Sequence, residues 1–174
     1  MIDERLSPHF WLSEFLRSET AERHGIDNSP TPAVFSRLRN NAQMMEEVRG
    51  ILGTPIHITS GYRCPDLERV IVGRAFYYWC ARHRRSPDDP EAWVSYLEGK
   101  AHPRGDASDF QSPSFGEPLK ICQAIEAETN IIFDQLIWEH SWVHIGWAKE
   151  GQHPRRQVLT LMRDGGYSFG IVQE

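Results

Sequence analysis

The sequence predicts an α+β fold, with helices early in the chain and a small antiparallel sheet late. Apolar side chains between residues 32 and 52 recur mostly at three- to four-residue spacing, which indicates a helix with one buried face. Residues 133–139 and 142–148 read as strands separated by two residues, which suggests a hairpin. Helices that precede strands, rather than alternate with them, are typical of α+β domains.

The N-terminal region predicts two short helical pieces before the long helix. Residues 10–24 read FWLSEFLRSETAERH, in which Ser13 and Ser18 are candidate N-caps and Gly25 is a candidate stop. A turn follows, and we expect the long helix to end at Gly53.

The middle of the chain begins with a β-branched run that ends on Gly61, which predicts a short strand and a turn. Residues 66–83 then read as a helix rich in large apolar side chains. The sequence SPDDP (86–90) breaks it, and a second short helix is expected to end at Gly99.

The last third predicts the remaining sheet. A strand begins near Ala107, and residues 117–130 have the pattern of an amphipathic helix. Residues 157–162 predict a further strand, and DGGYS (164–168) a turn. The whole chain, 1–174, is therefore expected to form a single domain.

Composition narrows the class of protein. The chain has 174 residues, 40% of them hydrophobic, which is enough to build a core without disulfides or other staples. No apolar stretch approaches the ~18 residues of a transmembrane helix. A net charge of −5 argues against a nucleic-acid partner, which usually meets a basic domain. We expect a monomer with no membrane span.

His102, Asp109 and His144 are the candidate metal ligands. On a helix, His102 and Asp109 would lie about 10 Å apart, too far to share one ion. The intervening Pro103 and Gly105 instead indicate a loop that folds His102 back toward Asp109 on the following strand. A His-Asp-His set leaves a fourth position for water, as in catalytic zinc sites. On spacing alone, three ordinary polar residues would give the same pattern.

Three motifs occur in order: SGYR at 60–63, H-x-x-G-x-A-x-D at 102–109 and W-V-H at 142–144. Together they resemble the zinc D-Ala-D-Ala carboxypeptidase family, and in particular its small peptidases from phage genomes and bacterial walls. The segments LSEF (12–15) and PRRQVLT (154–160) are similar to the same branch.

The resemblance implies a hedgehog- or DD-peptidase-like fold and a zinc-dependent peptidase. It implies that the enzyme cuts D-Ala-containing or L-Ala-D-Glu bonds in peptidoglycan stem peptides, as a carboxypeptidase or as an endopeptidase of the endolysin type. Carried over by position, His102, Asp109 and His144 are the Zn²⁺ ligands. The alternative is a non-catalytic, zinc-containing wall-binding or phage structural module of the same fold.

Hydrolysis needs a carboxylate that takes a proton from water and passes it to the leaving amine. Glu139 precedes the His144 strand across a tight turn and is the candidate base, unless it is an exposed hairpin-end residue. His140 is a candidate for steadying the oxyanion, or else a solvated turn residue. Arg63, with Ser60 beside it, is a candidate clamp for a substrate carboxylate, or else part of an internal salt bridge.

The chain departs from the family pattern at three places. The family has Ser-x-His at the first ligand, whereas here Lys100 takes the place of the serine, which makes Lys100 a candidate substrate contact. Many members have an acid three residues before the last ligand, where this chain has Ser141. The family's short link after the SGYR motif is replaced by a helical insertion at about 73–99.

Six aromatic side chains lie within the insertion, and they cannot all remain in water without forming a large apolar patch. We expect a helical hairpin that forms one wall of the cleft and influences substrate choice. A core extension remote from the cleft and a dimer contact are the alternatives. The aromatic residues are Phe76, Tyr77, Tyr78, Trp79, Trp93 and Tyr96.

The first residues lack the basic and apolar regions of a secretory signal peptide. The expectation is a protein that stays in the cytoplasm until it is released, or that a phage delivers to the cell wall.

Overall fold

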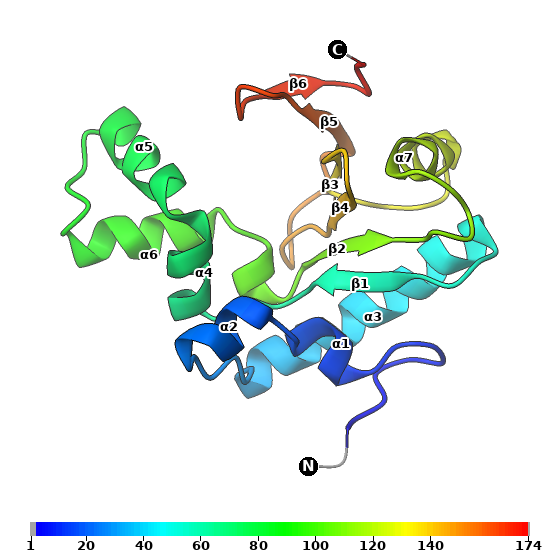
Figure 1. Cartoon of the computed structure of the whole chain (residues 1–174), viewed down its shortest axis with the longest axis horizontal. Coiled ribbons are helices and arrows are strands. Elements are labelled where there is room, and N and C mark those ends of the chain that lie inside the picture. Colours follow the sequence, from blue (N-terminus) through cyan, green and yellow to red (C-terminus); the bar gives the residue numbers. More distant parts are fainter. Residues whose placement is uncertain (1–2, 174) are drawn as a thin grey trace.

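The computed structural model describes residues 3–173, and its fold is α+β as predicted (Figure 1). Six strands form one sheet in the order β1-β2-β4-β3-β5-β6. The strands are β1 (His57–Ser60), β2 (Ala107–Gln111), β3 (Gln135–Trp138), β4 (Val143–Gly146), β5 (Gln157–Leu161) and β6 (Tyr167–Phe169). The helices are α1 (Leu12–Leu16), α2 (Glu19–His24), α3 (Pro32–Leu52), α4 (Pro65–Val72), α5 (Arg74–His83), α6 (Pro90–Glu98), the 3₁₀ helix η1 (His102–Arg104) and α7 (Pro118–Ala127).

One face of the sheet carries the main hydrophobic core. Phe110 of β2, Leu136 of β3 and Ile145 of β4 are fully buried there, in one cluster with side chains of α3 and α7. Because side chains alternate across a strand, their sequence neighbours point to the opposite face. That opposite face is where Asp109 of β2 and His144 of β4 lie.

The sheet is mixed rather than wholly antiparallel, because β5 pairs parallel to β3. The β3–β4 hairpin is present as predicted, so β4 ends beside the start of β3. The chain then passes β3 and enters β5 at that same end, where Gln135 pairs with Gln157. Strand patterns indicate neither order nor direction, so the expectation of a purely antiparallel sheet was wrong in this detail.

Three local expectations also differ from the structure. The segment expected as one helix up to His83 is divided by Gly73, whose positive φ of 40° ends α4 and starts α5. Ser13 does not cap α1; it lies within that helix, and its hydroxyl donates to Asp3. Ser18 caps α2 and Gly25 ends it, as expected. The turn expected at 164–168 is shorter, because Tyr167 already belongs to β6.

The insertion forms a lobe at one side of the sheet (Figure 1). Helices α5 and α6 share a small hydrophobic cluster of their own, separate from the main core. The buried members of this second cluster are Phe76, Cys80, Ala92, Trp93 and Tyr96. In the described residues no helix has the length and apolar character needed to cross a membrane.

Candidate metal centre

Two of the three predicted ligands are direct neighbours on the polar face of the sheet. Asp109 of β2 is paired with His144 of β4 in the antiparallel ladder. Side chains paired in this way have Cβ atoms about 4.5–5.5 Å apart, so both can reach one ion. Val143 and Ile145 point to the core, as their alternation with His144 predicted.

His102 reaches the same place from η1, the turn that precedes β2. Gly105 ends this turn with a φ of 77°, and a Cβ there would lie 3.2 Å from the Leu38 side chain of α3. Asn41 of α3 donates to the carbonyls of Gly105 and Ala107. The glycine therefore lets the chain pass close to α3, which fixes the loop that folds His102 back over the sheet.

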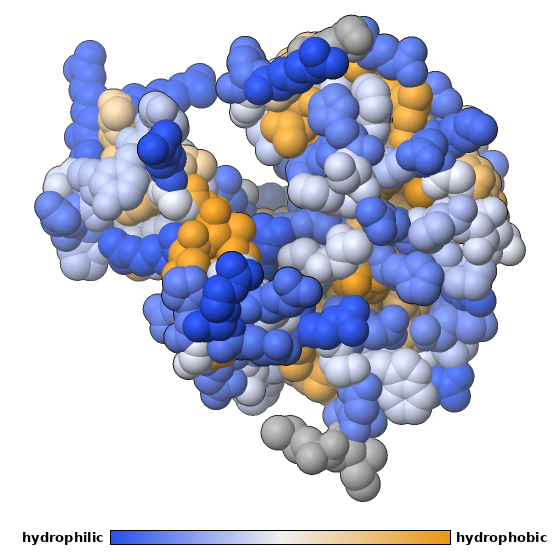
Figure 2. All heavy atoms as spheres, in the orientation of Figure 1, coloured by the Kyte–Doolittle hydropathy of each residue, from blue (hydrophilic) through white to orange (hydrophobic). Residues whose placement is uncertain are grey.

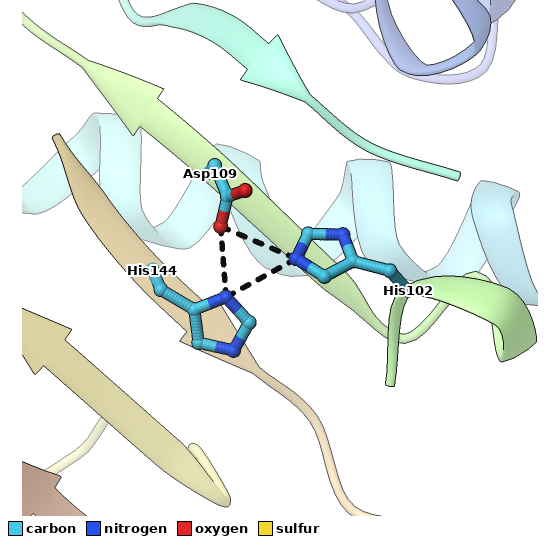
Figure 3. Close-up of side chains that lie close together, drawn as sticks. All are labelled: His102, Asp109 and His144. Carbon is cyan, nitrogen blue, oxygen red and sulfur yellow. Dashed lines mark hydrogen bonds and ion pairs between the residues drawn. The ribbon is translucent and has the colours of Figure 1, made fainter. Parts of the chain in front are cut away.

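The three side chains converge on one point (Figure 3). His144 Nδ1 lies 2.8 Å from Asp109 Oδ1, and His102 Nε2 lies 3.2 Å from each of these two atoms. Ligands bound at about 2 Å around a tetrahedral ion are about 3.3 Å from one another. Two imidazole nitrogens and one carboxylate oxygen are a donor set suited to zinc, so the residues present fit a metal ion of this kind.

Neighbouring groups hold two of these side chains in orientation. His102 Nδ1–H donates to the Gly61 carbonyl at 2.6 Å, which leaves the Nε2 lone pair directed at the centre. Arg63 Nη2 donates to Asp109 Oδ2 at 2.6 Å, which leaves Oδ1 toward the histidines. Both partners belong to the SGYR motif, so all three ordered motifs of the sequence meet at this site.

The electrostatics favour the protonation states that a cation requires. Burial lowers the pKa of His102 by more than the Asp109 charge raises it, so the imidazole is neutral. Burial alone would raise the pKa of Asp109, but its electrostatic and hydrogen-bond interactions with His102 and His144 hold this pKa well below its usual range. A neutral imidazole and an ionised carboxylate are the forms that bind metal.

A cavity of about 450 Å³ lies over the three side chains. Figure 2 shows the surface hollowed between the lobe formed by α5 and α6 and the rest of the molecule. On the sheet side the lining includes Ile137, Glu139 and Trp142, and on the other side it includes Ala75 and Tyr96 of the insertion. The insertion thus forms one wall of the cavity, and is not remote from it.

The structure brings most of the other predicted site residues to this cavity. Arg63, Lys100 and Glu139 line it. Arg63 also takes part in an internal salt bridge with Asp109, which was the alternative to a substrate clamp; it lies at the cavity in either role. Ser60 accepts a hydrogen bond from Arg63 Nε, which makes Ser60 a support for that guanidinium.

Glu139 and His140 are adjacent in the chain but differ in surroundings. Burial, followed by the Asp109 charge, raises the pKa of Glu139. His140 is exposed, has a positive φ of 58°, and its Nε2 lies 2.7 Å from the Leu161 carbonyl. His140 is not among the residues that line the cavity. The structure thus gives no contact in support of an oxyanion role for His140.

Among the residues that line the cavity, two buried polar ones carry no sequence signal for a site. Glu68 of α4 and Tyr96 of α6 line the cavity and are buried. Glu68 reads as an ordinary charged position in a helix, and no motif marks it. Tyr96 was noted only as one of six aromatic residues, without a role.

The fold and this site define a class: an α+β protein whose buried His-Asp-His group could hold a metal ion at a cavity floor. The family model described as Peptidase M15 matches residues 8–77. Over this segment the chain is similar to that peptidase family, in agreement with the resemblance seen in its motifs.

The matched segment contains the SGYR motif and ends before the three candidate ligands. The ligands therefore rest on the later motifs and on the geometry of the site. No curated protein and no solved structure matches the chain.

Proposed function

We propose that this protein is a zinc-dependent peptidase that hydrolyses peptide bonds in peptidoglycan stem peptides. The observation that carries the proposal is the His102–Asp109–His144 group at the floor of a cavity that also holds Arg63 and Glu139. The resemblance of the motifs to phage and bacterial wall peptidases supports this substrate class. It also supports action on the cell wall after release from the cytoplasm or delivery by a phage.

A bound zinc ion would supply a Lewis acid and lower the pKa of a water molecule at the site. His102 Nε2, Asp109 Oδ1 and His144 Nδ1 would hold the ion. The first test measures its stoichiometry and affinity. We expect one zinc per chain in the wild type and a loss of tight binding in His102→Ala. A variant at the exposed His57 is the matched control and should bind zinc as the wild type does. Stoichiometric zinc at unchanged affinity in His102→Ala would overturn the assignment.

Glu139 is the proposed general base. It lines the cavity, and its raised pKa brings its proton affinity closer to that of a base suited to neutral pH. Its carboxylate would take a proton from the attacking water and deliver it to the leaving amine. Arg63 would bind a substrate carboxylate beside it, with Ser60 and Asp109 fixing the guanidinium.

The second test measures turnover of stem peptides by mass spectrometry, which also identifies the bond that is cut. We expect Glu139→Gln to keep its fold and zinc but to lose about 10²–10⁴-fold in rate. Glu98→Gln, an exposed change on α6, is the matched control and should retain full rate. A loss well below tenfold in Glu139→Gln would place the base elsewhere. Zinc binding without any turnover on stem peptides or whole sacculi would favour the non-catalytic wall-binding module instead.

A further inference from the structure

Three side chains on the insertion side of the cavity have no part in the proposed hydrolysis as such. They are Glu68 of α4, Tyr96 of α6 and Lys100, which follows α6. All three line the same cavity as Arg63 and the candidate ligands. Their polar groups are poorly paired within the protein, which is unusual for residues at this depth.

Glu68 is 2% exposed, yet its Oε2 has no hydrogen-bond partner in the described part of the chain. The cation nearest to it is Arg63, whose Nη1 lies 3.6 Å from Oε2, while Arg63 Nη2 is committed to Asp109. A buried carboxylate oxygen that has lost its water and has no hydrogen-bond donor costs free energy, which the salt bridge with Arg63 offsets only in part. Glu68 therefore presents an unused acceptor at the cavity wall.

Lys100 and Tyr96 present the complementary groups. The Lys100 ammonium lies 4.4 Å from the centroid of the Tyr96 ring, and within residues 3–173 no carboxylate pairs with it. The Tyr96 hydroxyl is buried without a hydrogen-bond partner among those same residues. The aromatic face holds the ammonium in place while leaving its N–H groups available to an anion.

Glu68 and Lys100 have opposite charges and share one cavity, but no ion pair joins them in the described chain. A ligand that satisfies both must carry a positive and a negative group close together. We propose that this part of the cavity is a subsite for a free amino-acid end, with its ammonium on Glu68 and its carboxylate on Lys100. The Tyr96 hydroxyl supplies a third hydrogen bond.

The inference deepens the proposed function and rests on it, because it names the stem peptide that the site selects. Along a stem peptide, backbone amines are consumed in peptide bonds. A carbon with both an ammonium and a carboxylate then occurs where a diamino-dicarboxylic residue ends its side chain. Stems with such a residue are the expected substrates, and stems with lysine at that position are disfavoured.

The experiment measures binding to the zinc-loaded protein by calorimetry, with three γ-D-glutamyl dipeptides whose glutamyl amine is acetylated, as it is acylated in the stem. The first ends in meso-diaminopimelate, the second in the same residue with its side-chain carboxylate amidated, and the third with its side-chain amine acetylated. A charge-assisted hydrogen bond is worth about 1.5–3 kcal/mol, so each blocked dipeptide should bind about 10- to 100-fold more weakly than the first. Equal dissociation constants for all three, or no binding at millimolar concentration, would overturn the subsite. This arm needs no variant.

Two variants then assign the contacts. Glu68→Gln should lose the preference over the acetylated dipeptide but retain the preference over the amidated one. Lys100→Gln should show the reverse, a crossover that a merely structural role would not produce. Glu98→Gln and Lys120→Gln, both exposed, are the matched controls and should retain both preferences. A wild-type preference that neither cavity variant alters would overturn the assignment to these residues.

Hydrolysis of the corresponding stem peptides separates this inference from the proposed function. Equal turnover of stems with and without the free amino-acid end would keep the function and overturn the subsite. If the two variants show the crossover in binding but no stem peptide is hydrolysed, the subsite is supported and the proposed peptidase activity is contradicted.

Discussion

Gly61 is the residue at which the SGYR motif touches the metal centre. Its carbonyl accepts the hydrogen bond that orients His102. A Cβ at this position would lie 2.7 Å from both Cα and the carbonyl oxygen of Phe15, and backbone atoms cannot turn aside. The glycine is therefore required by a close approach of two chain segments, and its carbonyl position depends on that approach.

We accordingly expect Gly61→Ala to lower the free energy of unfolding by about 1–3 kcal/mol, since it overpacks a filled site. Displacing the carbonyl that orients His102 should also weaken zinc binding about 10- to 100-fold. Urea unfolding and competition titration with a zinc chelator measure the two effects. Gly50→Ala in α3 is the matched control, because a Cβ there meets nothing within 4 Å. Wild-type stability and affinity in Gly61→Ala would show that the close approach does not govern the site.

Asp134, immediately before β3, gives a prediction about pH. It accepts hydrogen bonds from the backbone N–H and the guanidinium of Arg155, which lower its pKa against the opposing effect of burial. Its folded-state pKa is thus below the unfolded value, so the stabilisation is complete above about pH 4 and is lost as pH falls through the folded-state pKa.

We expect Asp134→Asn to lower the free energy of unfolding at neutral pH by up to about 1 kcal/mol, a modest value because Arg155 is largely exposed. The difference from wild type should shrink in acid, measured as urea unfolding from pH 7 to 3. Asp88→Asn, in the exposed loop between α5 and α6, is the control and should differ from wild type by less than about 0.5 kcal/mol. A difference for Asp134→Asn that is constant over this range would contradict the ion-pair explanation.

Some residues of the site could be predicted from the sequence and others could not. His102, Asp109 and His144 were identifiable because three motifs in order resemble a known peptidase family, whereas their spacing alone did not distinguish them from ordinary polar residues. Glu68 was not, because its role depends on α4 and the sheet facing one cavity, which is a long-range property. Local sequence around Glu68 shows only a helix with a charged position.

At the scale of elements, local patterns predicted helices and strands well but not their junctions or neighbours. The hairpin of β3 and β4 follows from two strand patterns and a two-residue turn. The parallel partner of β3 was not predictable, since it depends on which edge of the hairpin the chain reaches after β4. The break at Gly73 depends on a positive φ, which the apolar pattern across it conceals.

Removal of the insertion should change substrate choice without unfolding the protein. Its own hydrophobic cluster does not belong to the main core, so its removal should leave that core intact. We expect a variant with 74–98 replaced by a short Gly-Ser link to fold and bind zinc, but to change its relative rates on different stem peptides. Calorimetric zinc titration and mass spectrometry of peptide mixtures measure this.

Tyr77→Ser combined with Tyr78→Ser is the matched control, because both side chains are mostly exposed and neither lines the cavity. The double variant should keep the wild-type order of substrates. If the shortened chain cuts the same substrates at the same rates as wild type, the insertion has no role in specificity.

In the molecule as a whole, the two walls of the cavity are supported by different hydrophobic clusters. Asp109 and His144 lie on β2 and β4, each of which has a strand on both sides. The facing wall stands on the small second cluster, which includes five buried residues and carries exposed tyrosines on its outer side. The α+β class was predictable from the order of patterns, whereas this division into two cores required the tertiary contacts.

Because the two walls rest on separate hydrophobic clusters, warming should affect them differently. Regions with few buried contacts open at lower free energy than the centre of a sheet. As temperature rises, the lobe formed by α5 and α6 should therefore unfold locally while the three candidate ligands keep their arrangement. For the proposed peptidase, selectivity among substrates would then be lost at a lower temperature than hydrolysis itself.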